Sequence, residues 1–140
     1  ATSNTTLTVA QSGSVCTGNK ADGITITLPA AAAGLTYAVH VGTTITSNAF
    51  TITAASSADT MQGQLISNDF TDLGSLTIMN ENVTTVAFDQ PAADDHQIVM
   101  DGTTKGGKLG SYVNCTAITA AIWHVDGFLS SDGSLATCFT

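Results

Sequence analysis

The sequence is poor in positive charge. It contains no arginine and only three lysines, Lys20, Lys105 and Lys108, against eleven aspartate and glutamate residues, so its formal net charge is −8. Nucleic-acid binding depends on lysine and arginine side chains that displace the counterions condensed on phosphates. An anionic membrane surface attracts the same side chains. The composition therefore predicts neither nucleic acid nor a membrane as a partner.

Charge of either sign is scarce, and long apolar runs are absent. Charged residues make up 10% of the chain, while the hydrophobic fraction is an ordinary 43%. Such a composition favours a folded chain over a disordered one, and no run approaches the roughly 20 apolar residues of a membrane helix. Residues 1–140 are expected to form a single domain. The polar residues 1–15 are a candidate N-terminal arm that reaches onto a neighbour.

The residues that catalysis requires are also missing. Glycosidases need two carboxylates across a cleft, but Glu81 is the only glutamate and lies in an Asn/Glu turn. No Gly-x-Ser-x-Gly elbow occurs, and Cys16 lacks the local signature of a nucleophile. Lys105 and Lys108 flank two glycines without the pattern of a phosphate loop, so a glycine-rich hairpin or bulge is expected there. The chain is expected not to be an enzyme and to need no cofactor.

The most concentrated polar cluster is Asp94-Asp95-His96. Carboxylates beside a histidine can hold a cation, but adjacent residues of an extended segment point in opposite directions, and Pro91 indicates a loop. A solvated turn is expected, with a calcium or other metal contact as the alternative. His40 and His124 lack the partners of a zinc site and are expected to be exposed or hydrogen-bonded. No metal site is therefore predicted.

The three cysteines, Cys16, Cys115 and Cys138, are an odd number at spacings too wide for a zinc motif. We expect free and mostly buried thiols that behave as small apolar groups. One disulfide with a spare thiol is the alternative. Neither arrangement implies catalysis.

Threonine, valine and isoleucine dominate the rest of the chain, and apolar and polar residues alternate in short runs. The clearest alternation places Ile24, Ile26 and Leu28 on one face of a strand. The same pattern covers residues 37–41 and 50–54. Further strands are expected at residues 7–9, 64–66, 76–79, 83–88, 97–100, 110–113 and 118–125.

Short strands that recur about every ten residues, with turn signals between them, are typical of an all-β protein. We expect an antiparallel β-sandwich of jelly-roll type, with a β-tulip or small barrel as the alternative. The alanine-rich residues 29–34 are too short for a stable helix and are expected to form a turn closed by Gly34. Tyr37, Tyr112 and Trp123 lie in strand-like patterns that suggest core positions, with Trp123 as the anchor.

Four segments, taken together, resemble small virion proteins of tailed bacteriophages, especially phages of marine bacteria and cyanobacteria. The segments are TITLPAA followed by GLTY within residues 25–37, DGTTKGG at 101–107, WHVDG at 123–127 and GSLAT at 133–137. Two positions depart from the pattern, since related endings often have proline at Cys138 and tyrosine at His124. The resemblance implies a capsid decoration (cement) protein, a class that often forms trimers and clamps neighbouring coat subunits without catalytic residues.

The expected function is therefore a structural virion protein on the outer capsid surface, made in the host cytoplasm. The expected partners are the major capsid protein and two further copies of the chain in a homotrimer. The candidate contact residues are Leu7, Val9, Phe128 and Phe139. The alternative is a phage fibre or spike module that binds a host receptor or glycan. That alternative predicts exposed aromatic side chains forming a sugar platform, and the assignment of the Tyr and Trp residues to the core speaks against it.

Overall fold

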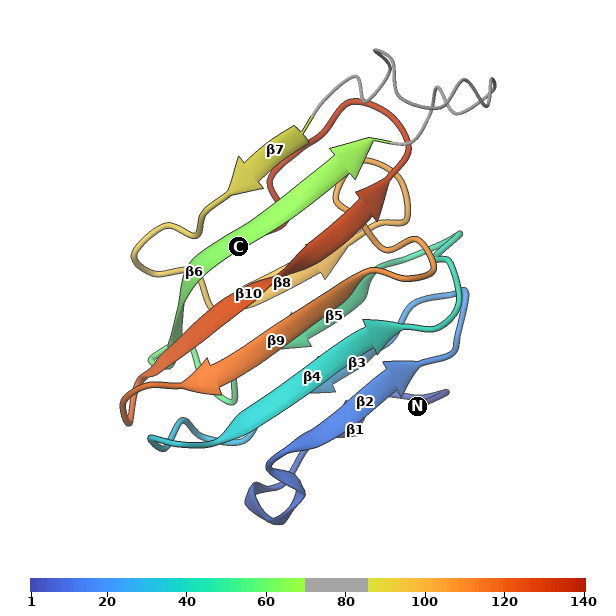
Figure 1. Ribbon diagram of the computed structural model, residues 1–140. Helices are drawn as coiled ribbons and strands as arrows, with labels where there is room; N and C mark the ends of the chain where they lie inside the picture. The colour runs from blue at the N-terminus through green and yellow to red at the C-terminus, as the bar shows by residue number, and fades with distance from the viewer. Residues whose placement is uncertain (70–85) are drawn as a thin grey trace.

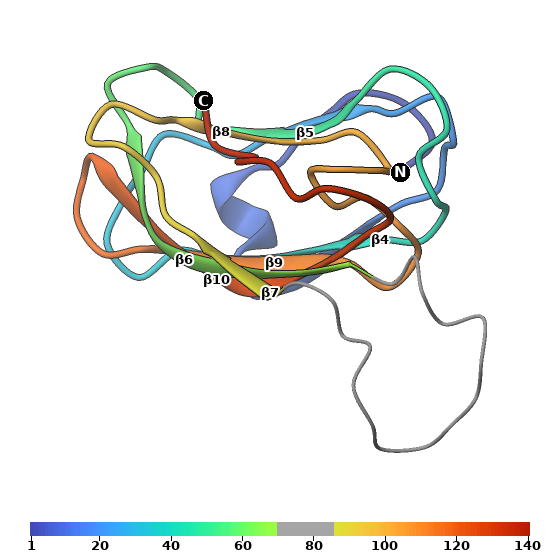
Figure 2. The ribbon, with the colours of Figure 1, turned by 90° about the horizontal axis from the view of Figure 1, so that it is seen from above.

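Alternating threonine and aliphatic residues build the strands of two facing sheets. The computed structural model describes residues 1–69 and 86–140. In this part of the chain ten strands pair into a four-stranded and a six-stranded sheet, which lie as two separate layers (Figure 2). The expected all-β sandwich is confirmed, and the two described sheets form no closed barrel.

The four-stranded sheet has the order β1-β3-β5-β8, and the six-stranded sheet has the order β2-β4-β9-β10-β6-β7. Figure 1 looks onto the outer face of the six-stranded sheet, with the four-stranded sheet behind it. The strands are β1 (Thr5–Thr6), β2 (Ser14–Gly18), β3 (Thr25–Thr27), β4 (Thr36–Val41), β5 (Phe50–Thr53), β6 (Thr60–Asp69), β7 (Val86–Asp89), β8 (Gln97–Met100), β9 (Tyr112–Ala117) and β10 (Ile122–Ser131). A single 3-10 turn, η1 (Val9–Gln11), lies between β1 and β2.

The sheets of this sandwich are mixed, whereas antiparallel pairing was expected. From β1 to β5 the chain alternates between the two sheets, and β1, β3 and β5 are parallel, as are β2 and β4. Parallel neighbours need a long crossover, and here each crossover contains a strand of the opposite sheet. Antiparallel pairing begins with the later strands, where β9 joins β4 and β10, while β10 and β6 are parallel.

The positions of most expected strands are confirmed, and three differ. Residues 110 and 111 precede β9, which begins at Tyr112. Residues 7–9 leave β1 and enter η1 instead of forming a strand, and residues 118–121 form the turn before β10. Residues 29–34 form the expected connection, closed by Gly34 with a φ of 93°. The expected strand at 76–79 and the turn at Glu81 lie outside the described residues, as does the first part of 83–88.

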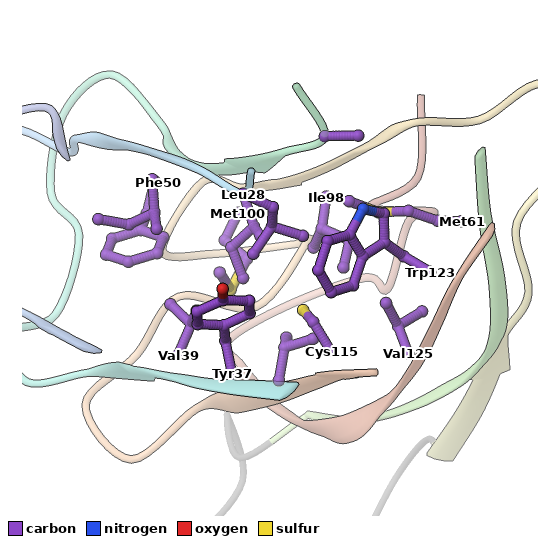
Figure 3. Packing of buried hydrophobic residues seen from close by; sticks show 14 of the residues in the cluster. Leu28, Tyr37, Val39, Phe50, Met61, Ile98, Met100, Cys115, Trp123 and Val125 are labelled. Carbon is purple, nitrogen blue, oxygen red and sulfur yellow. The ribbon is translucent and has the colours of Figure 1, made fainter. Parts of the chain in front are cut away.

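The core fills the space between the sheets (Figure 3). Trp123, Phe50 and Met61 are fully buried there, and the Trp123 ring lies 5.9 Å from the ring of Tyr37. The Tyr37 hydroxyl donates a hydrogen bond to the Thr8 carbonyl at 2.9 Å. The core positions of Trp123 and Tyr37 are thus confirmed. The expected core position of Tyr112 is wrong, because its side chain lies on the outer face of the six-stranded sheet.

Within residues 1–15, the expected N-terminal arm, two segments pair with strands of the sandwich. β1 pairs with β3, and the Leu7 N–H donates to the Thr27 carbonyl at 2.8 Å, which buries the Leu7 side chain. β2 then begins at Ser14 beside β4. The first strands therefore form one edge of each sheet.

The glycine-rich segment between β8 and β9 crosses from one sheet to the other and is not a hairpin. Gly106 has a φ of 78°, and a Cβ there would lie 2.7 Å from the Leu129 Cβ, so the backbone packs directly on a core side chain. Asp101 holds the start of this loop by accepting hydrogen bonds from the Thr103 and Lys105 N–H groups at 2.8 and 2.9 Å. The loop ties the two layers together.

Candidate functional site

The alternation of each strand sends one set of side chains into the core and the other onto an outer face. In the six-stranded sheet the inward set includes Val39, Cys115, Val125 and Leu65, all of which are buried. Their neighbours along each strand therefore point outward, toward the viewer of Figure 1. This outer face is the first of two candidate binding surfaces.

Five outward side chains from five different strands form a single line across this face, here called the aromatic row. The strand registers place each member directly beside the next one on the neighbouring strand. From β4 to β7 the members are His40, Tyr112, Phe128, Ile66 and Phe88. Phe88 is 62% exposed, Ile66 38% and Tyr112 37%. With neighbouring strands about 4.8 Å apart, the row is about 19 Å long.

The ring of Tyr112 is held in place by a neighbour. The His40 and Tyr112 rings are stacked, with their centroids 5.7 Å apart and their planes 29° from parallel. Aromatic cross-strand pairs of this kind stabilise a sheet and limit the rotamers of both side chains. The row therefore presents a preorganised apolar ridge.

Beside the aromatic row the same face is hollowed. A hollow of about 360 Å³ is lined by polar groups from β2, β4, β9 and β10, and we call it the polar hollow. Its outward lining residues are Ala38 and the polar residues Thr36, Asn114, Thr116 and Asp126, and Gly13 and Ser14 line it at the edge strand. The Asn114 side-chain amide donates a hydrogen bond to Asp126 Oδ2 at 2.9 Å. This bond orients the two most polar groups of the hollow.

Formal charge is nearly absent from this face. Among the outward residues of the six strands whose side chains the structure describes, Asp126 is the only one with a carboxylate, and none is a lysine. The single ion pair found in the described residues, between Lys108 Nζ and Asp132 Oδ2 at 2.6 Å, lies outside the strands. Most contacts on this face would therefore be insensitive to salt.

The outer face of the four-stranded sheet is the second candidate surface, and we call it the threonine face. Here the parallel register places Thr25 beside Thr51 and Thr27 beside Thr53. The face consists of Thr6, Thr25, Thr27, Thr51, Thr53, Gln97 and Val99. None of these side chains is ionisable, and those of β3, β5 and β8 are half-buried in the sheet surface.

The four contact residues expected from the sequence separate into two groups. Leu7 and Phe139 are each 4% exposed and belong to the core. Val9 is exposed in η1, and Phe128 lies half-buried within the aromatic row. Phe128 is therefore the only one of the four that lies on either outer face.

The Asp94-Asp95-His96 segment forms the expected turn. Asp95 Oδ2 accepts a hydrogen bond from the Ala92 N–H at 2.7 Å. This hydrogen bond stabilises the loop before β8. Within residues 1–69 and 86–140 no group of three or more His, Cys, Asp or Glu residues could hold a metal ion. In the same residues no helix is long and apolar enough to cross a membrane.

The three cysteines are free thiols. Burial raises the pKa of Cys115 to about 12, with a smaller effect from the negative charge of Asp126. Burial likewise raises the pKa of Cys138, and the carboxylate of Asp89 adds to the effect. Both thiols therefore stay protonated and poorly nucleophilic near neutral pH.

Comparisons with protein-family models, with curated proteins and with solved structures give no match. The site must therefore be interpreted from its own chemistry. Sequence reasoning missed the aromatic row, because its members come from five strands and only the register of the sheet aligns them. The pairing of two identical Thr-Ile-Thr segments, at 25–27 and 51–53, was the one sequence signal for the threonine face.

Proposed function

We propose that this chain is a structural protein of a bacteriophage virion that binds the outer surface of the capsid and stabilises contacts between coat subunits. The resemblance in sequence supports this function. The observation that carries the proposal is the threonine face, a flat sheet surface without an ionisable side chain. The central parts of protein interfaces are depleted of charged residues. Contacts between uncharged groups are not screened by salt, so they persist at high ionic strength.

The size of the threonine face favours several copies acting together. Its four strands at about 4.8 Å spacing span about 14 Å. Its longest strands, β5 and β8, have 4 residues, or about 13 Å at about 3.3 Å per residue. The face therefore measures about 190 Å², much less than the roughly 800 Å² that each partner buries in a standard interface. One copy would therefore bind the shell weakly, and a homotrimer would multiply three modest contacts into stable binding.

Cryo-electron microscopy of virions tests the function directly. The expected result is density for this sandwich on the outer shell at about one copy per coat subunit. Absence of the chain from the outer shell would contradict the proposal, and a handful of copies at the tail would support a fibre or spike module instead.

A variant pair tests the face. Thr51→Lys places a charge in the middle of the threonine face, while Gln62→Lys places the same charge on the outward side of β6. We expect Thr51→Lys to weaken binding to purified undecorated capsids by at least about tenfold, or about 1.4 kcal/mol. Gln62→Lys should bind as the unaltered chain does. Equal binding by both variants would remove the threonine face from the proposal.

A fibre or spike module that binds a host receptor or glycan is the second candidate function. The observation in its favour is the aromatic row, because exposed aromatic side chains are what such a module needs. Copy number in the virion distinguishes the two functions.

A further inference from the structure

We infer that the aromatic row and the polar hollow together form a binding site for a neutral saccharide chain. This site goes beyond the proposed capsid role, because it lies on the opposite sheet from the threonine face and would stay exposed on a decorated particle. It rests on three features of the six-stranded sheet, namely the line of rings, the hollow beside it and the near absence of charge.

The aromatic row fits the apolar side of a sugar ring. One side of a pyranose presents C–H groups, which are attracted to the electron-rich face of an aromatic ring. Tyr112, Phe128 and Phe88 lie along one line that is about 19 Å long from β4 to β7. A line of that length matches an extended oligosaccharide better than a single sugar, since successive rings could contact successive strands.

The polar hollow supplies partners for the hydroxyl groups. It lies on the same outer face, two residues along β9 and β10 from Tyr112 and Phe128, which is about 7 Å. Asp126 and Asn114 each carry an oxygen beyond the hydrogen bond that joins them, and hydrogen bonds to a carboxylate are stronger than those between neutral groups. Their mutual bond fixes them before a ligand arrives, which lowers the entropy lost on binding.

The hollow also distinguishes a saccharide from an apolar protein partner. A protein surface that covered the aromatic row would also cover Asp126 and Asn114 and remove them from water. Burying a carboxylate without new hydrogen bonds is costly, whereas sugar hydroxyls would replace the lost water. The net charge of −8 disfavours an acidic polysaccharide, because its carboxylates or sulfates would be repelled.

Affinity electrophoresis and titration calorimetry of the purified chain test the site. The probes are three neutral polysaccharides, laminarin, dextran and mannan, with alginate as the acidic comparison. We expect saturable binding to at least one neutral probe and weaker binding to alginate. Tyr112→Ala and Asp126→Ala should each weaken that binding by about tenfold. Ala38→Gln should do the same by filling the hollow without touching the core.

The control is Thr51→Ala on the threonine face, which should bind the saccharide as the unaltered chain does. Thermal unfolding of each variant separates loss of the site from loss of the fold. Failure of the chain to bind all three neutral probes overturns the inference. So does unchanged binding by Tyr112→Ala and Asp126→Ala. If Tyr112→Ala instead abolishes binding to capsids, the row is a protein interface and the inference is wrong.

The saccharide test and the capsid test have independent outcomes. Saccharide binding is measured on the isolated chain, so a chain absent from the capsid could still bind laminarin. A chain found on the shell could equally bind no sugar.

Discussion

The two outer faces of the sandwich share a core but differ in how they are assembled. The centre of the threonine face comes from two parallel strands, β3 and β5, in which one short motif recurs, so that Thr25 lies beside Thr51 and Thr27 beside Thr53. The antiparallel strand β8 completes the face. The aromatic row joins residues from five strands between 40 and 128, through both parallel and antiparallel pairs. The first face repeats a local pattern, whereas the second exists only because five strands of the six-stranded sheet are in register.

That difference fits the separate uses that we propose for the two surfaces. Stacked sheets lie about 10 Å apart, and each face looks away from the other (Figure 2). A single sandwich can therefore contact a shell with the uncharged threonine face and present rings and hydroxyl partners on the opposite side. Changes that act on one face alone should leave the other intact, while changes to the shared core should affect both.

Trp123→Ala should have the largest effect and should weaken binding at both faces, because they share one core. The indole is fully buried between the sheets, and removing a buried aromatic side chain typically costs about 3–5 kcal/mol. Denaturant unfolding should show a loss of that size, with both binding activities reduced together. Phe88→Ala, at the exposed end of the aromatic row, is the control and should change stability by less than about 1 kcal/mol.

Gly63→Ala should damage only the six-stranded sheet. A Cβ at Gly63 would lie 2.0 Å from the Val125 carbonyl oxygen, at a φ of 130°, and would push β6 away from β10. We expect a loss of about 2 kcal/mol or more in unfolding free energy, and a larger loss of saccharide binding than of capsid binding. Gly110→Ala is the control, because Gly110 also has a positive φ but a Cβ there meets no atom within 4 Å. An equal loss of stability in both variants would show that backbone strain, and not the contact with Val125, is responsible.

Thiol labelling should modify the cysteine at the edge of the six-stranded sheet faster than the cysteine in its middle. Cys16 in the edge strand β2 is half-buried, while Cys115 in β9 and Cys138 are buried. Mass spectrometry after brief iodoacetamide treatment should find Cys16 modified first. The other two thiols should react only on unfolding, because burial excludes the reagent and raises their pKa. Early modification of Cys115 would indicate that the central strands open locally.

The strand positions and the main core residues could be predicted from the sequence, because alternation reports which residues share a face. Alternation at 24–28, 37–41 and 50–54 identifies three strands and their buried sides. It does not report which strands are neighbours or whether they are parallel, and the mixed sheets were missed for that reason. Leu7 and Phe139 were expected as contact residues, and their burial was not foreseen. Backbone pairing near both termini buries them, through the Leu7 N–H to Thr27 and the bridge from Phe139 to Ile98.

Tyr112 shows why part of the candidate site could not be predicted. Its neighbour Ser111, directly before β9, is polar and yet fully buried, which reverses the polarity that alternation predicts. The Ser111 hydroxyl accepts hydrogen bonds from the Gly107 and Ser130 N–H groups at 3.3 and 3.0 Å. These bonds offset the cost of burying the hydroxyl, and the alternation of the strand then sends Tyr112 outward. A tertiary hydrogen-bond pattern thus decides the side on which the ring lies.

The smallest expected effect concerns the loop that joins the two sheets. Burial raises the pKa of Asp101, but hydrogen bonds from the Lys105 and Thr103 N–H groups and the Thr104 hydroxyl outweigh it and lower the pKa below its ordinary value. The unfolded chain therefore binds this proton at a higher pH than the folded chain does. The stabilisation is present above about pH 4, the ordinary value for a free aspartate, and is lost as the pH falls through the folded value.

Asp101→Asn keeps the shape of the side chain and removes its charge. Unfolding free energy measured from about pH 5 down to pH 2 should fall less steeply in this variant than in the unaltered chain. Because the loop belongs to neither face, saccharide and capsid binding at neutral pH should weaken equally or not at all. A selective loss on one side would mean that the loop positions that sheet alone.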